Sequence, residues 1–187
     1  MRSTIRIAVL GTLCVSMAIG ASGQGIPRAE IKLDDSFILG VRARVDQEEI
    51  ESARWATTHA SSNEVRQFAQ SLLRGHSSAQ NAALRLAVQL KTELKITGDT
   101  DQAISRRQVA SQAALHVLKG KYFDRAFLSA VRDEHASEID KVNRWYAEVA
   151  DNDSVKAYLK EIMPTLVKHQ QTAERLLAKT GTTIAAR

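Results

Sequence analysis

The sequence predicts an all-α protein, an antiparallel four-helix bundle with one extra short helix in a crossover. Three observations support this prediction. The 187-residue chain is rich in helix-favouring residues and contains only 2 Pro and 9 Gly, a balance that favours helix throughout. Apolar residues recur at helical spacing along most of the chain. The sequence also shows neither the strict alternation of a strand nor the turn signal of a hairpin.

The first 23 residues have the three parts of a secretory signal peptide. Arg2 and Arg6 form a charged end, residues 5–19 form an apolar run that is short for a membrane span, and Ala21-Ser22-Gly23 suits cleavage. We therefore expect a periplasmic or secreted protein with no stable membrane span after cleavage. An uncleaved membrane anchor is the alternative. Cys14 is the only cysteine, so the mature chain would depend on packing rather than disulfides.

Two long amphipathic helices are expected after a flexible tail at residues 24–33. The first runs from about 35 to 60 and the second continues to about Leu94. Between them, Ser61-Ser62-Asn63-Glu64 has the pattern of a break followed by a capping box. Arg42 and Asp46, four residues apart on the first helix, are interpreted as part of a solvated exterior.

The second half of the chain predicts a loop, a shorter helix and two more long helices. The loop spans 95–101 and contains Gly98. The shorter helix follows and stops at Gly120, a good C-terminal signal. Pro164 should kink the last long helix. The expected segments are a short helix at 102–118, long helices at 122–150 and 154–180, a bundle domain at 34–180 and a tail at 181–187.

Two tight turns and one long crossover that carries a helix are typical of ferritin-like bundles.

The distribution of charge excludes one class of partner. The formal net charge is +5 and becomes +3 once Arg2 and Arg6 are removed with the signal (5 − 2). Basic residues are spread along every helix without aromatic residues between them, so we expect no nucleic-acid partner.

Four polar residues fall within the apolar stripes of the four long helices, one on each helix. They are Glu49, His76, His135 and His169. Burying an ionisable group costs several kcal/mol unless it is paired or liganded. Four independent burials of this kind are improbable, so the pattern predicts a shared polar site.

Three imidazoles and one carboxylate suit Zn²⁺, Cu²⁺ or Fe²⁺, because imidazole is a good ligand for all three ions. Asp124 and Glu138 fall on the face of His135, where they could orient imidazole N–H groups. The alternatives are a metal-free polar layer, with the protein acting as a structural or interaction module of the cell envelope, and a small-molecule pocket. His59 and His116 are expected to be exposed or capping residues.

Catalytic motifs are missing from the sequence. It contains no Glu-x-x-His pair, which di-iron carboxylate bundles use, no Gly-rich phosphate loop, no His-Glu-x-x-His and no Gly-x-Ser-x-Gly. Enzymatic activity is therefore not favoured, although a metal-assisted redox or hydrolytic reaction remains the third hypothesis.

Several motifs occur together in an order and spacing that resemble a known family. They are Glu49-Ile50-Glu51-Ser52-Ala53-Arg54-Trp55-Ala56, Phe68-Ala69 before His76, Tyr122-Phe123-Asp124-Arg125-Ala126-Phe127, His135, and Met163-Pro164-Thr165-Leu166-Val167-Lys168-His169. The chain resembles, over about residues 34–178, the secreted bacterial ferritin-like family catalogued as domain of unknown function 4142.

The resemblance implies an exported helical bundle with polar residues at family-typical positions, but no agreed activity. One position departs from the family pattern, because Gly75 stands where the family tends to place Asp before the histidine. If that carboxylate orients the imidazole, the site should be weaker in this chain. Our leading hypothesis is a metal-binding bundle with a role in sequestration or stress protection.

Overall fold

The computed structural model describes residues 33–185, with side chains through Thr180, and this part of the chain is all helical. The prediction of an all-α protein is confirmed. The predicted signal peptide at 1–23 and nearly all of the predicted tail at 24–33 lie outside the described residues. The helices are α1 (Asp35–His59), α2 (Asn63–Gln89), α3 (Gly98–Val117), α4 (Gly120–Lys141), the π-helical turn η1 (Val142–Tyr146), α5 (Ala147–Val149) and α6 (Asp153–Ala185).

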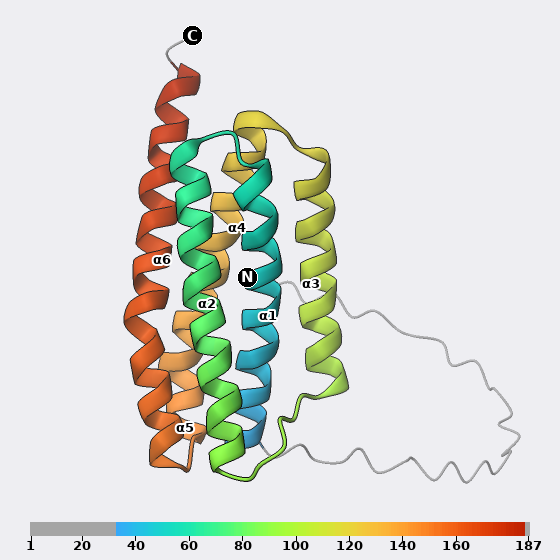
Figure 1. The fold of residues 1–187 in the computed structure, drawn as a ribbon, viewed down its shortest axis with the longest axis vertical. Coiled ribbons are helices and arrows are strands. Elements are labelled where there is room, and N and C mark those ends of the chain that lie inside the picture. Colours follow the sequence, from blue (N-terminus) through green and yellow to red (C-terminus); the bar gives the residue numbers. More distant parts are fainter. Residues whose placement is uncertain (1–32, 186–187) are drawn as a thin grey trace, which may run out of the picture. The chain divides into compact units, whose positions relative to one another are not determined.

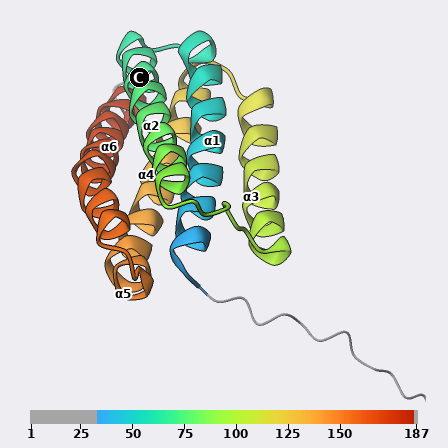
Figure 2. The same cartoon turned by 60° about the horizontal axis from the view of Figure 1, so that its bottom comes forward.

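Four long helices run alongside one another, and α3 lies outside them (Figure 1). The closest pairs are α1 with α2 and α4 with α6, and α2 also packs against α6. The view from the lower end shows α3 standing beyond α1 (Figure 2), where it contacts α1 and α4. The predicted short helix between the second and third long helices is therefore present as α3.

The end of α2 differs from the prediction. The helix ends at Gln89 rather than at Leu94, because Lys91 takes a left-handed conformation with φ 52°. The amide of Thr92 then donates to the carbonyl of Ala87 and the amide of Lys91 to that of Val88. This is a Schellman cap, which usually has Gly at the left-handed position. Because Lys occupies that position, this cap could not be predicted from the residue type.

The third long helix contains one π-helical turn that the periodicity did not predict. It lies at Val142–Tyr146, where the amide of Ala147 donates to the carbonyl of Val142. The additional residue in the turn rotates the following side chains. Tyr146 is buried, whereas Trp145 is 61% exposed.

Two interhelical turns are held by a carboxylate from a different helix. Asp124 of α4 accepts hydrogen bonds from the amides of Ser61 and Ser62 and from the Ser61 hydroxyl, at 2.7–2.8 Å. Asp35 of α1 accepts from the amides of Asp151 and Asn152 before α6. The break predicted before the second helix is present, but Ser62 forms no side-chain cap there. Asp124 satisfies the free amides instead.

The chain ends in the longest helix. α6 continues through Pro164 and reaches Ala185, beyond the predicted end at 180. Gly120, the first residue of α4, has φ 60°, a conformation that Gly adopts without the strain of a side chain. In the described part of the chain, none of the helices combines the length and the apolar character needed to cross a membrane.

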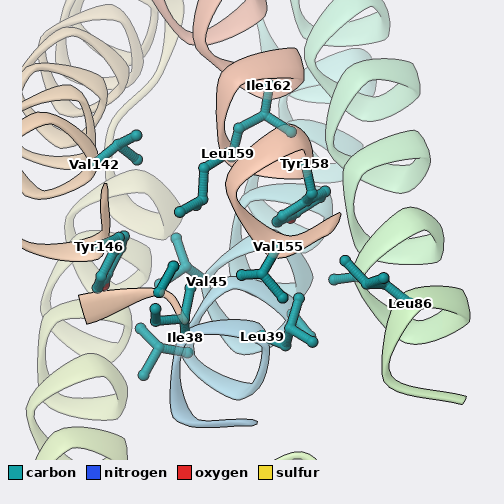
Figure 3. Packing of buried hydrophobic residues seen from close by; sticks show 14 of the residues in the cluster. Ile38, Leu39, Val45, Leu86, Val142, Tyr146, Val155, Tyr158, Leu159 and Ile162 are labelled. Carbon is teal, nitrogen blue, oxygen red and sulfur yellow. The ribbon is translucent and has the colours of Figure 1, made fainter. Parts of the chain in front are cut away.

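The core consists of two apolar clusters at different heights along the helices. One contains Ile38, Val45, Leu86, Val142, Tyr146, Val155 and Leu159, and Figure 3 shows how these side chains converge. The other contains Ala53, Val65, Leu72, Phe127, Val131 and Ala173. On each of the four long helices, the stretch between the two clusters carries buried polar residues. The core is thus divided by one polar layer.

Candidate metal centre

Three histidines meet in this polar layer. His76 of α2, His135 of α4 and His169 of α6 are each at most 3% exposed. Their ring centroids form a nearly equilateral triangle with sides of 5.3, 5.4 and 5.3 Å. One ring nitrogen from each lies within 4.8 Å of the other two. The sequence could place these residues on inward faces, and the structure shows that they also share one level.

The ring of His76 is oriented by a carboxylate on α1. Its Nδ1 lies 3.0 Å from Oδ1 of Asp46, and a carboxylate oxygen can only accept, so Nδ1 carries the proton. In the neutral ring, Nε2 then presents a lone pair. This buried atom has no hydrogen-bond partner among the described residues. The arrangement is the carboxylate–histidine pairing that commonly supports a metal ligand.

His135 is fixed in a similar way by the backbone. Its Nδ1 donates to the carbonyl of Val131, 2.9 Å away, which leaves Nε2 to face Nδ1 of His169 at 3.3 Å. Burial, together with the neighbouring His76 and His169, holds the pKa of His135 well below its usual value of 6.5. The ring is therefore neutral at neutral pH, and Nε2 is available as a ligand.

His169 fits into the cluster because the residue opposite it has no side chain. A Cβ built on Gly75 would lie 2.8 Å from Cε1 and 3.3 Å from Nε2 of His169. Burial lowers the pKa of His169 to about 4. The expectation that Gly75 weakens the site stays a prediction, and two contacts bear on it. Asp46 already supplies a carboxylate to His76, and any side chain at position 75 would displace His169.

The distances can be compared with those around a bound ion. Tetrahedral Zn²⁺ with Zn–N bonds of about 2.0–2.1 Å separates its nitrogen ligands by about 3.3–3.4 Å. The nitrogens of His135 and His169 already have this separation, at 3.3 Å. Since no pair in the cluster exceeds 4.8 Å, the widest pair would close by at most about 1.4 Å around such an ion. The three residues fit a nitrogen-coordinated divalent metal.

Glu49 of α1 adds a carboxylate to the cluster. Its two oxygens lie 3.8 Å from Nε2 of His76 and 3.8 Å from Nδ1 of His135. Burial, and then the charges of Asp46 and Glu138, raise the pKa of Glu49 to about 8. A group that is both buried and beside three imidazoles is placed to become a fourth ligand when a cation compensates its charge.

A further carboxylate of α4, Glu134, lies beside Glu49. Burial, and then the neighbouring Glu49, raise the pKa of Glu134 to about 8. Ionisation of both carboxyl groups at once is disfavoured, because the two like charges would repel each other. Arg107 of α3 lies beside this pair in a small depression that Glu48 also lines. Glu134 was not predicted as a site residue, because nothing in the sequence distinguishes it from the other acidic residues near His135.

Behind the histidines, α1 contributes a buried ion-pair network. Arg42, which is fully buried, donates to Asp46 at 2.9 Å and to Glu138 at 2.6 Å, and Lys141 donates to Glu138 from the surface. The interpretation of Arg42 and Asp46 as a solvated exterior was wrong. An i, i+4 pair of opposite charge has the same spacing on either face of a helix, and here Glu138 supplies the partner that allows burial.

The remaining sequence candidates have other contacts. Glu138 was predicted to orient an imidazole, but it contacts Arg42, which in turn binds Asp46 beside His76. Burial opposes the ionisation of Glu138, but Arg42 and Lys141 lower its pKa below the usual value. Asp124 hydrogen-bonds to the α1–α2 turn, and none of its described hydrogen bonds reaches a histidine. His59 and His116 are exposed and lie against Trp55, with ring centroids 3.4 and 4.2 Å from it.

Fold and site together define a class, an all-helical protein with a buried cluster of three histidines between two apolar cores. Comparison with family models identifies the particular family. Residues 23–176 match the family described as Domain of unknown function (DUF4142), and the chain belongs to it. Comparisons with curated proteins and with solved structures gave no match.

Proposed function

We propose that the protein binds one divalent transition-metal ion through His76, His135 and His169, with Glu49 as the fourth ligand. The ion is of the class that favours imidazole and carboxylate ligands, which includes Zn²⁺, Cu²⁺ and Fe²⁺. The proposal includes a ferritin-like arrangement of the four long helices, export to the periplasm or medium, and a role in metal sequestration or stress protection.

One observation carries the proposal. The Nε2 atom of His76 is buried without a hydrogen-bond partner and lies 3.8 Å from Glu49, while Asp46 holds the opposite nitrogen. Leaving such an atom unpaired costs about 1–3 kcal/mol. A bound cation removes that cost and also compensates the buried carboxylate of Glu49.

The second candidate is a metal-free polar layer in a structural or interaction module of the cell envelope. The specific observation in its favour is that His135 and His169 already contact each other at 3.3 Å, a separation at which one ring can donate to the other. In that case the layer would hold the helices in register and need no ion.

The two candidates make different predictions about purified protein. We would purify the chain without a histidine tag, measure its metal content, and titrate the chelator-treated protein with Zn²⁺ or Cu²⁺. Metal binding predicts close to one ion per chain and loss of that ion in the His76→Ala, His169→Ala double variant. The His59→Ala, His116→Ala double variant is the matched control and should keep the ion. A protein that binds no added ion would leave the polar layer as the explanation.

A further inference from the structure

A cavity of about 390 Å³ opens beside the histidine cluster, between α2 and α6. His76 and His169 both line it. On the α2 side its lining includes Arg74 and His76 together with small residues that leave space between the two helices, namely Ser71, Gly75, Ser78, Ala79 and Ala82. The cavity therefore gives a solvent-side approach to the proposed metal position.

Four of the residues that line the cavity carry a buried polar atom without a hydrogen-bond partner among the described residues. These atoms are Oδ2 of Asp46, Nε of Arg42, Nε2 of His76 and the hydroxyl of Tyr158, and the four residues are at most 5% exposed. Most buried polar atoms in proteins are paired, so an unpaired group calls for a ligand or a bound water molecule. Four such residues around one cavity favour a polar occupant beside them.

The charges around the opening favour an anion. Arg74 of α2 and Lys168 of α6 are exposed at the rim, where Glu161 is the one opposing charge among the described lining residues. Deeper in the cavity, Asp46 is already neutralised by Arg42. A divalent ion held by three neutral imidazoles and a single carboxylate would add net positive charge at the floor.

We propose that this cavity binds a small oxyanion, a carboxylate or an inorganic oxyanion, which adds a fifth ligand to the four that the protein supplies to the metal. The anion would enter between Arg74 and Lys168 and reach the ion beside His76 and His169. This inference rests on the proposed function, because the metal is one of the two attractions for the anion. It makes the centre an open site rather than a closed structural one.

The test uses untagged protein loaded with Co²⁺, whose visible absorption reports changes in coordination. The loaded protein is titrated with acetate, with sulfate, and with acetamide as a neutral isostere of acetate. We expect a saturable spectral change with an anion and none with acetamide. Acetate and sulfate distinguish a carboxylate from an inorganic oxyanion. The Arg74→Ala, Lys168→Ala variant should bind the anion about fivefold more weakly, the order expected for two exposed charges.

The control variant is Arg85→Ala, Lys160→Ala, which removes the same charge from exposed positions on the same two helices outside the cavity. It should bind the anion as the wild type does. If neither anion changes the Co²⁺ absorption spectrum, or if both variants weaken anion binding equally, the cavity holds only water and the proposal is overturned. If no Co²⁺ spectrum forms before any anion is added, the proposed metal function itself fails, and the anion site fails with it.

Discussion

Replacing Gly75 by Ala should change the affinity for metal while leaving the stability of the fold nearly unchanged. In a helix interior this change normally stabilises a protein by about 0.8–1 kcal/mol. Here the new Cβ would lie 2.8 Å from Cε1 of His169, whereas ordinary contacts begin at 3.4 Å. The imidazole must therefore move by about 0.6 Å, which is more than the roughly 0.2 Å tolerance of metal–ligand distances.

We expect the Gly75→Ala variant to fold with a stability within about 1 kcal/mol of the wild type, because helix propensity and local crowding oppose each other. Its affinity for Zn²⁺ should fall by about ten- to hundredfold, the loss typical when a ligand is mispositioned. The assay is competition with a chromophoric chelator, combined with urea unfolding of the metal-free protein.

Gly98 provides the matched control, since a Cβ built there meets nothing within 4 Å. The Gly98→Ala variant should bind Zn²⁺ as tightly as the wild type. If Gly75→Ala also binds Zn²⁺ within twofold of the wild type, then His169 is not a ligand or its position is not fixed by α2, and the reasoning above is refuted.

Three further predictions concern the stability of the metal-free protein. Arg42→Met should destabilise it by about 3–5 kcal/mol, because Asp46 loses its buried partner; Arg144→Met, at an exposed i, i+4 pair, should cost under about 1 kcal/mol in the same urea titration. Gly40→Ala should destabilise it by about 1–3 kcal/mol, since the new Cβ would lie 2.1 Å from the carbonyl oxygen of Lys95, and a gain in melting temperature would contradict that contact. With chelator present, the free energy of unfolding should fall by about 2 kcal/mol per proton between pH 6.5 and 8.5. Glu49 and Glu134 each have a pKa of about 8 in the folded state, so the folded protein keeps a proton that the unfolded chain has already released. The Glu49→Gln, Glu134→Gln variant should lose most of this fall and keep only the smaller part that comes from Glu48, whose pKa burial raises to about 7. A wild type whose stability is constant over this range would count against the raised pKa values.

Much of the fold follows from the sequence because apolar periodicity determines where long helices lie. The ends of α1, the position of α3 and the start of α6 are close to the predicted bounds. The end of α2 and the π-helical turn were missed for a physical reason. The end of α2 depends on the left-handed backbone of Lys91, and the π-helical turn depends on a change in hydrogen-bond spacing at Ala147. Neither segment contains Gly or Pro, which commonly mark such irregularities.

The inward orientation of Glu49, His76, His135 and His169 could also be predicted, because each interrupts an apolar stripe. The supporting residues could not. Arg42 and Asp46 have the spacing of a solvated pair, and only the approach of Glu138 from α4 shows that they are buried. The role of Gly75 likewise depends on how closely α6 approaches α2, which no pattern within α2 can specify.

The most direct test of the central claim is a crystal structure of the protein grown with Zn²⁺, with anomalous data collected on both sides of the zinc absorption edge. Our account predicts one strong anomalous peak in the polar layer, about 2.0–2.2 Å from a nitrogen of His76, His135 and His169 and from an oxygen of Glu49. Without any peak there, or with zinc only at exposed residues such as His59 and His116, the three histidines would be a metal-free element of the core.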